Sequence, residues 1–175
     1  SEEDLLLKKQ LRENPKEQSE NVMIVDLVRN DLSKTAIKAS VKVEELFGIY
    51  TFKQLNQMIS TVVSEVAENQ NPVNIIQSTF PMGSMTGAPK LSAMKIIEEV
   101  EQSKRGLYSG AIGYFTPDND FDFNVVIRSI LYNQKNNYLS FSVGSAITIN
   151  ANAEDEYNEC LLKAQAMKKV LTHAD

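Results

Sequence analysis

The chain has 175 residues and carries 18 Lys and Arg against 23 Asp and Glu, a formal net charge of −5. An apolar fraction of 42% with 23% charged residues is typical of a globular domain, or of part of one, and excludes an intrinsically disordered chain. No apolar run is long enough to span a membrane, and an acidic balance without a basic cluster argues against nucleic acid as a partner.

The rarest residue types narrow the possible chemistry. Cys160 is the only cysteine, which excludes an internal disulfide and a cysteine-based zinc site and suits a reducing cytoplasm. His173 is the only histidine and lies in what we expect to be a frayed tail, so histidine-based triads are not expected. The sequence opens on Ser1-Glu2-Glu3-Asp4 without the layout of a signal peptide, and we expect a fragment or a processed chain.

Helices are expected at the beginning of the chain. The pattern predicts one over residues 3–13 and a second that starts at Asn14, which can cap it, with Pro15 in the first turn and Glu17 at the capping-box position. Residues 22–28 are too apolar for a surface helix, so we expect them to be largely buried.

Strands and helices are expected to follow in mixed order. The β-branched run 59–63 favours a strand within 53–67 over a helix. The helix expected after Pro89 has Ala93, Ile96, Ile97 and Val100 on its apolar face. The other predicted elements are strands at 40–45, 110–116, 122–132 and 138–149, and helices at about 73–79 and 153–171.

Two of these helices carry carboxylates one turn apart, Glu17 with Glu20 and Glu156 with Glu159. One interpretation is ordinary: Glu17 belongs to a capping box, and Glu159 forms a surface ion pair with Lys163. The other interpretation is a shared hard cation, because Mg²⁺ takes one or two carboxylates together with waters and an anionic substrate. Spacing alone leaves both open.

Three further segments have a structural and a ligand-binding interpretation. The loop from Gly83 to Lys90 fails the phosphate-loop spacing, but its backbone amides at a helix start can bind an anion; a tight turn is equally possible. Arg128, on an expected half-buried strand, needs an internal carboxylate or binds one from a ligand. The segment 144–146 allows either close backbone approach to a ligand or a bulge. A tyrosine placed like Tyr108, between two glycines, more often packs against its neighbours than donates a hydrogen bond to a ligand.

Taken together, these segments resemble the chorismate-utilising enzymes over residues 16–170, as their C-terminal catalytic half. The motifs that carry the resemblance are Lys16-Glu17-Gln18-Ser19-Glu20-Asn21-Val22-Met23-Ile24-Val25-Asp26-Leu27-Val28-Arg29-Asn30-Asp31-Leu32, Gly87-Ala88-Pro89-Lys90, Gly110-Ala111-Ile112-Gly113-Tyr114-Phe115, Val126-Ile127-Arg128-Ser129, Gly144-Ser145-Ala146 and Glu156-x-x-Glu159-x-x-x-Lys163-Ala164. The loop Gly83-Ser84-Met85-Thr86-Gly87 is more similar to the aminodeoxychorismate synthase branch than to the anthranilate synthase branch, which is the alternative.

The resemblance implies a fold and a set of roles. The fold is α+β, half of the chorismate-binding fold with orthogonally packed antiparallel sheets flanked by helices, and residues 1–175 form the C-terminal part of that catalytic domain. The implied metal is Mg²⁺. The implied catalytic residues are Glu17, Glu156 and Thr86; the implied metal ligands are Glu20 and Glu159; the implied substrate-binding residues are Ser84, Tyr108, Arg128, Gly144, Ser145 and Lys163.

The resemblance also implies a reaction and a partner subunit. At two points, however, this sequence departs from the family pattern. The implied reaction is amination of chorismate for 4-aminobenzoate and folate synthesis in the cytoplasm, with ammonia from a glutamine amidotransferase subunit. Gln57 stands where many relatives have histidine, so imidazole chemistry is unavailable there. No residue matches the family's nucleophilic lysine segment, so this chain alone is expected to hold about half of an active site. A non-catalytic binding domain is therefore the third alternative.

Overall fold

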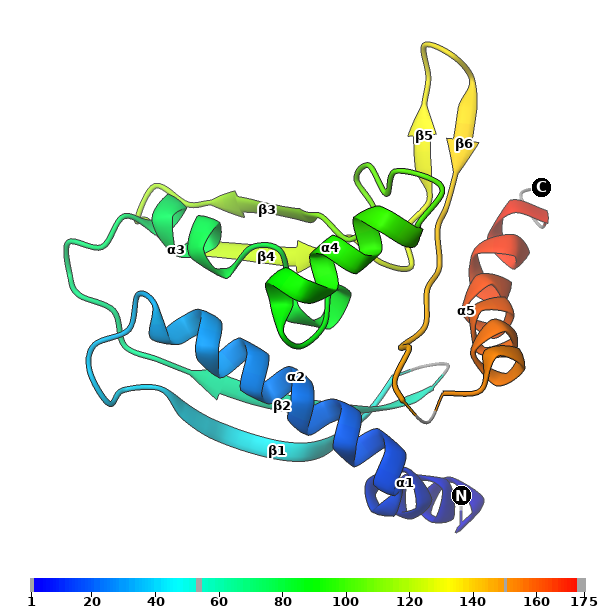
Figure 1. Ribbon diagram of the computed structural model, residues 1–175, viewed down its shortest axis with the longest axis horizontal. Helices are drawn as coiled ribbons and strands as arrows, with labels where there is room; N and C mark the ends of the chain where they lie inside the picture. Colours follow the sequence, from blue (N-terminus) through cyan, green and yellow to red (C-terminus); the bar gives the residue numbers. More distant parts are fainter. Residues whose placement is uncertain (1, 53–54, 150, 173–175) are drawn as a thin grey trace. The chain divides into compact units, whose positions relative to one another are not determined.

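The computed structural model describes residues 2–52, 55–149 and 151–172, and the chain forms two compact units, residues 1–102 and 103–175. Both units contain helices and strands, and every strand pair in the described residues is antiparallel. The predicted mixture of helices with antiparallel strands is confirmed (Figure 1).

The first unit begins with two consecutive helices, α1 (Glu2–Glu13) and α2 (Pro15–Ser33). Asn14 separates them and caps α2, because its side-chain oxygen accepts hydrogen bonds from the backbone N–H groups of Lys16 at 2.9 Å and Glu17 at 3.3 Å. Pro15 occupies the first turn, where its missing N–H has no helical acceptor to lose. Both predicted helices and the predicted cap are confirmed.

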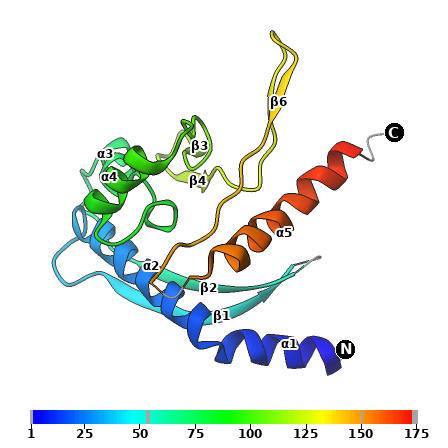
Figure 2. The same cartoon turned by 45° about the vertical axis from the view of Figure 1, so that its right-hand side comes forward.

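Helix α2 lies along a hairpin of β1 (Lys42–Thr51) and β2 (Asn56–Val63), as both ribbon views show (Figures 1 and 2). The Ser60 hydroxyl connects the two layers: it donates to the Asn21 side-chain oxygen at 2.5 Å and accepts from the Phe47 backbone N–H at 3.0 Å. The strands expected at 40–45 and within 53–67 are confirmed, and the first is longer than expected.

The expected burial of residues 22–28 is wrong in extent. Val25 is buried with 7% exposure, whereas Val22 is 40% exposed and the other apolar side chains of the run are half-buried. A continuous apolar run in a helix points in every direction around the axis, whereas the hairpin covers one side only. Apolar content therefore overestimated the burial of this helix.

The first unit ends with α3 (Pro72–Thr79), a short 3₁₀ turn η1 (Gly83–Met85) and α4 (Lys90–Val100). Both predicted helices are confirmed, with Pro89 at the N-cap of α4 instead of inside its first turn. The predicted apolar face is only partly covered: Ala93 and Ile97 are half-buried, but Ile96 is 57% and Val100 65% exposed. Periodicity identifies such a face, but burial also requires a neighbouring element to cover it.

The second unit contains two hairpins and a long helix (Figure 1). Strand β3 (Ala111–Phe115) pairs with β4 (Phe121–Val125), β5 (Leu131–Asn133) pairs with β6 (Tyr138–Ser140), and α5 (Ala153–Thr172) follows. The side chains of Phe115, Phe121 and Phe123 contact one another across the first hairpin, with ring centroids 5.3–6.2 Å apart. Ala164 and Met167, each 4% exposed, form the buried side of α5.

Two predicted strands of this unit are much shorter than expected. The run 122–132 is interrupted between β4 and β5, where Arg128 has a φ of 50°, and the run 138–149 ends as a strand at Ser140. A left-handed residue disrupts the regular β-ladder, and β-branched composition gives a strand only where a partner strand is available. The expectations that Arg128 and residues 144–146 lie on strands are therefore wrong.

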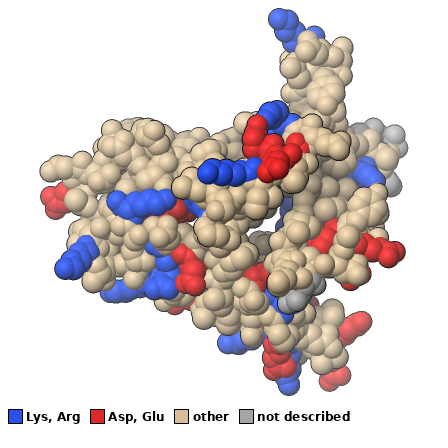
Figure 3. Space-filling view, in the orientation of Figure 1, with Lys and Arg blue, Asp and Glu red and all other residues tan. Residues whose placement is uncertain are grey.

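The hydropathy of the helices and the distribution of surface charge in the described residues agree with the expectations from composition. None of the helices in the described part of the chain combines the length and the apolar character that crossing a membrane requires. Acidic and basic side chains are interspersed on the face shown in Figure 3, without one continuous basic field. His173 lies outside the described residues, and Cys160 is half-buried on α5.

Candidate functional site

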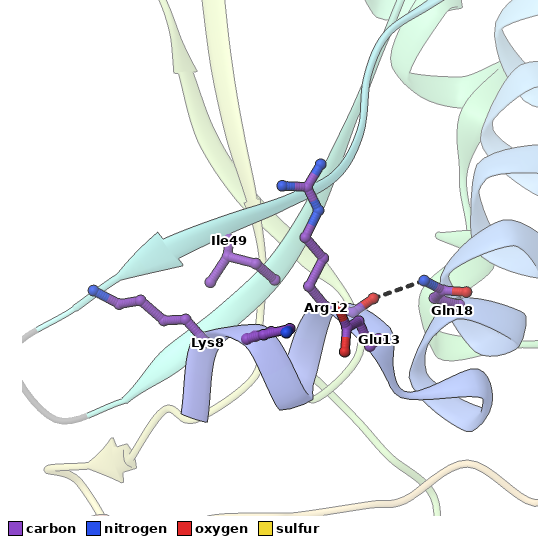
Figure 4. A pocket seen from close by; sticks show the side chains of 6 residues that line it. Lys8, Arg12, Glu13, Gln18 and Ile49 are labelled. Carbon is purple, nitrogen blue, oxygen red and sulfur yellow. Dashed lines mark hydrogen bonds between the residues drawn. The ribbon is translucent and has the colours of Figure 1, made fainter. Parts of the chain in front are cut away.

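A basic pocket of about 510 Å³ lies beside α1 in the first unit (Figure 4). Its lining residues are Lys8, Lys9, Arg12, Glu13, Gln18 and Ile49. Two of its polar groups already have partners: Lys8 forms an ion pair with Asp4 at 2.6 Å, and the Gln18 amide donates to the Arg12 carbonyl at 2.6 Å. Because this lining includes none of the residues predicted for a site, the candidate site has to be built from contacts elsewhere.

The first pair of carboxylates lies at the start of α2. Glu17 and Glu20 are half-buried and one helical turn apart, which places them on one side of the helix. The Glu17 backbone N–H donates to the Asn14 cap, and the nearer Glu20 carboxylate oxygen lies 3.9 Å from the Lys16 ammonium. The structure thus places Glu17 and Glu20 on one side of α2, with Glu17 in the first turn, where a carboxylate is favoured.

The glycine loop of the first unit forms a tight turn that packs directly on α2. The Thr86 hydroxyl closes this turn by donating to the Met82 carbonyl at 3.2 Å or the Gly83 carbonyl at 3.3 Å. Gly83 is buried, and a Cβ added to it would lie 2.8 Å from the Leu27 Cβ. The tight-turn interpretation therefore describes this loop well, while Ser84 keeps an exposed side chain and the Thr86 oxygen can still accept a hydrogen bond.

The lysine that ends this loop does not face the turn. The Lys90 ammonium lies 2.5 Å from a carboxylate oxygen of Asp31 and donates to the Thr79 carbonyl at 3.2 Å. Asp31 is buried, with 4% exposure, and also pairs with Lys34 at 2.9 Å. Sequence reasoning assigned no role to Asp31 or Lys90, although a lysine at the first position of a helix and an aspartate in the last turn of another both oppose the helix dipole.

The second unit gathers most of the other predicted residues around the start of α5. The Ser145 hydroxyl hydrogen-bonds to the carboxylate of Glu156, which is only 4% exposed. The Lys163 ammonium donates to the Gly144 carbonyl at 3.0 Å and lies 2.6 Å from a Glu159 carboxylate oxygen. These contacts hold the irregular segment 141–149 against α5.

Tyr108 belongs to the same cluster. A Cβ added to Gly144 would lie 2.8 Å from the Tyr108 hydroxyl oxygen, so glycine is what allows this hydroxyl to approach the backbone. The cluster in the second unit therefore consists of Tyr108, Gly144, Ser145, Glu156, Glu159 and Lys163. It offers two hydroxyls, a backbone segment and an ammonium group, which can bind a polar anionic ligand, and two carboxylates, which can bind a hard cation.

Two residues singled out in the sequence lie outside these contacts. Arg128 is exposed in the turn between β4 and β5 rather than half-buried on a strand, so its guanidinium is open to solvent. Gln57 is half-buried on β2, opposite Tyr50 of β1. Neither residue forms part of the cluster at α5, and the substrate-binding role of Arg128 stays a prediction.

The residue types fit a magnesium ion. Among the described residues, no three His, Cys, Asp or Glu side chains converge as a metal site. Mg²⁺ is usually held by one or two carboxylates, with waters and substrate oxygens completing its shell, and the pairs on α2 and α5 supply that donor type. The assignment of Glu20 and Glu159 as ligands stays a prediction.

Comparison with known proteins decides the family. The family model described as chorismate binding enzyme matches residues 1–169. The chain belongs to the chorismate-binding enzyme family. The resemblance inferred from the sequence motifs is confirmed, and the α+β fold expected from it agrees with the solved structures of this family.

Relatives within the chorismate-binding family carry two different names. A probable chloroplastic aminodeoxychorismate synthase of Oryza sativa subsp. japonica is 44% identical over 97% of this chain, which spans 19% of that protein. An anthranilate synthase component 1 of Saccharolobus solfataricus is 37% identical over 97% of this chain, which spans 40% of that protein. The crystal structure of anthranilate synthase component I from Streptococcus pneumoniae matches 95% of this chain and 38% of its own, with a TM-score of 0.81 and 32% identity.

Proposed function

We propose that the protein containing this chain aminates chorismate to 4-amino-4-deoxychorismate, for 4-aminobenzoate and folate synthesis. The observation that carries this proposal is the higher identity to the rice aminodeoxychorismate synthase, 44%, than to the archaeal anthranilate synthase component 1, 37%, at the same coverage of this chain. The chain spans only 19% and 40% of these two relatives, so the activity is proposed for the whole protein.

The residues of the second unit are proposed to bind the substrate. Chorismate carries two carboxylates, and carboxylates are bound by cations and by hydrogen-bond donors. Lys163, held between Glu159 and the Gly144 carbonyl, and the exposed Arg128 guanidinium supply positive charge. Ser145 and Tyr108 supply hydroxyl groups beside the Gly144 backbone.

The residues of the first unit are proposed to act on the substrate ring and the metal. Ser84 and Thr86 would line the ring pocket, and Glu17 would act with Glu156 as a catalytic carboxylate. When bound by Glu20 and Glu159, Mg²⁺ would neutralise a substrate carboxylate and favour departure of the hydroxyl group. Ammonia would be supplied by a glutamine amidotransferase subunit, and we place the reaction in the cytoplasm.

Anthranilate synthesis is the second candidate function. It is favoured by the 37% identity to the archaeal anthranilate synthase component 1 and by the TM-score of 0.81 to the pneumococcal one. The two products differ in the position of the amino group and in the enolpyruvyl group, which anthranilate formation eliminates as pyruvate and aminodeoxychorismate formation retains.

The product decides between the two candidates. The full-length protein would be incubated with chorismate, Mg²⁺ and ammonium, and the products followed by mass spectrometry. An amino product that keeps the enolpyruvyl group supports the proposal. Anthranilate with pyruvate replaces it by the second candidate, and binding of chorismate without turnover replaces it by a non-catalytic role.

The metal ligands have a separate test. In the full-length protein, Glu159→Gln should weaken Mg²⁺-dependent chorismate binding, measured by calorimetry at several Mg²⁺ concentrations. Glu154→Gln is the matched control, because it removes an exposed charge from the same helix. Equal Mg²⁺ dependence in both variants would remove Glu159 from the proposed ligand set.

A further inference from the structure

The geometry points to Lys90 and Asp31 as a positioning pair that fixes the loop 83–87 on the face of α2 that carries Glu20. This inference rests on the proposed function for its catalytic consequence, since Ser84 and Thr86 are assigned to the substrate pocket there. Its structural part concerns the first unit alone and can be tested without substrate.

Both members of the pair stand at the unfavourable end of their own helices. Lys90 is the first residue of α4, where the partial positive charge of the helix disfavours a cation, and Asp31 is in the last turn of α2, where an anion is disfavoured. Each such position is unfavourable on its own. The pairing of the two side chains at 2.5 Å compensates for both unfavourable interactions with the helix dipoles. It explains why a lysine at a helix start and an aspartate at a helix end occur together here.

The same cluster fixes the chain before the loop as well as after it. Lys90 donates to the Thr79 carbonyl at 3.2 Å, and Lys34, which also pairs with Asp31, donates to the Ser78 carbonyl at 3.1 Å. These two carbonyls belong to the C-terminal turn of α3, which attracts cations. Asp31 thus connects the end of α3 and the start of α4, the two ends of the loop, to α2.

The loop touches α2 again at Leu27, one helical turn before Asp31. Gly83 is buried there and leaves no room for a Cβ beside Leu27. Residues separated by seven and eleven positions share a helix face, so Glu20, Leu27 and Asp31 lie in one stripe along α2. At 1.5 Å rise per residue, Glu20 is about 10 Å along the axis from Leu27.

This arrangement makes α2 a rigid spacer between a carboxylate and the glycine loop. Within the loop, a turn is closed by the Thr86 hydroxyl and by the Met85 and Thr86 backbone N–H groups, which donate to the Met82 and Gly83 carbonyls. Its placement on the Glu20 stripe depends on Gly83 and on the buried pair. Lys90 and Asp31 would therefore act through the loop, as positioning residues, without touching substrate.

Hydrogen exchange tests the structural part. Lys90→Met should accelerate exchange of the Met85 and Thr86 amides by about tenfold or more, while the β1–β2 amides keep their rates. Lys95→Met, which removes an exposed lysine from the same helix, should leave all of these rates unchanged. Unchanged loop exchange in Lys90→Met would overturn the inference.

A double variant separates positioning from plain stability. Asp31→Leu combined with Lys90→Met replaces the pair by apolar side chains of similar size, which commonly restores stability. We expect the thermal midpoint to recover while the loop amides still exchange fast, because apolar contacts lack the directional bonds to the Thr79 carbonyl. Full recovery of loop protection would overturn the specific role of the ion pair.

Kinetics test the link to catalysis in the full-length protein. Lys90→Met should lower kcat by about 10²-fold, the order expected for a misplacement of about 1 Å, with KM for chorismate changed less than about threefold. Lys90→Arg should recover most of that loss. A normal kcat in Lys90→Met, with fast loop exchange, would overturn the catalytic link. Absence of product in the wild-type protein would overturn the proposed function and leave the exchange result to decide the structural part.

Discussion

The two units hold their irregular segments in different ways. In the first unit, the loop 80–89 is fixed by a buried aspartate between two lysines that also reach the carbonyls at the end of α3. In the second unit, the segment 141–149 is held by single contacts from α5, with Ser145 on Glu156 and Lys163 on the Gly144 carbonyl.

The two arrangements differ in the group that is left without a partner when one side chain is removed. Removing a member of a buried ion pair leaves a charge in a poorly hydrated place, whereas water can replace a contact at a partly exposed group. Asp31 has a side-chain exposure of 6% and pairs with two lysines. In the second unit, Glu156 is also buried but is bonded to the neutral Ser145 hydroxyl, and the charged pair of Lys163 and Glu159 is 32% and 40% exposed. The first unit should therefore respond more strongly to polar substitutions than the second.

The largest effect is expected for Asp31→Leu. It leaves the ammonium groups of Lys90 and Lys34 side by side without their shared carboxylate, and the free energy of unfolding should fall by about 3 kcal/mol. Asp26→Leu is the control on the same helix, because Asp26 pairs with Arg29 at the surface and should cost under about 1 kcal/mol. Urea unfolding measures both, and equal losses would show that the Asp31 cluster behaves as a surface pair.

A smaller loss is expected for Glu156→Gln in the second unit. The amide oxygen can still accept from Ser145, but a buried NH₂ group is introduced, and the cost should be about 1–2 kcal/mol. Exchange of the amides in 141–149 should accelerate in this variant and stay normal in Glu154→Gln. A loss as large as that of Asp31→Leu would contradict the proposed difference between the units.

Two close-packed glycines, one in each unit, give a direct comparison. Gly83→Ala places a Cβ 2.8 Å from the Leu27 Cβ, beside a helix backbone that cannot move, and should cost about 2 kcal/mol. Gly144→Ala meets the Tyr108 hydroxyl at 2.8 Å, at the end of a side chain that can rotate away, and should cost about 1 kcal/mol or less. Thermal unfolding of both variants gives the order, and the reverse order would show that Tyr108 is held more rigidly than Leu27.

The smallest effect concerns the ion pair of α1. Hydrogen bonds from Lys8, and next from Asn56, lower the pKa of Asp4 from its ordinary value. Because the folded pKa is depressed, this contribution to stability is present above the unfolded pKa and is lost as pH falls through the folded one. A carboxyl NMR titration should show the Asp4 pKa rising in Lys8→Met and rising less in Asn56→Ala. No rise in either variant would mean that these contacts do not form in solution.

The sequence by itself determined much of the local structure and the family. The Asn14-Pro15 cap and the helix after Pro89 were predicted because caps and prolines act on their immediate neighbours. The family followed from several motifs in one order, and the match over residues 1–169 confirmed it. The residues grouped at α5 came from the same motifs, although their contacts could not be derived from spacing.

Only the tertiary structure decided which of these side chains meet and which segments become strands. Arg128 has a left-handed backbone, and residues 141–149 lie against α5, because pairing depends on a partner strand that composition does not specify. Asp31 and Lys90 are 59 positions apart. Each charge is unfavourable at its own end of a helix, and the pairing of the two side chains compensates for this. Their pairing is a long-range electrostatic contact, and no local pattern in the sequence contains both partners.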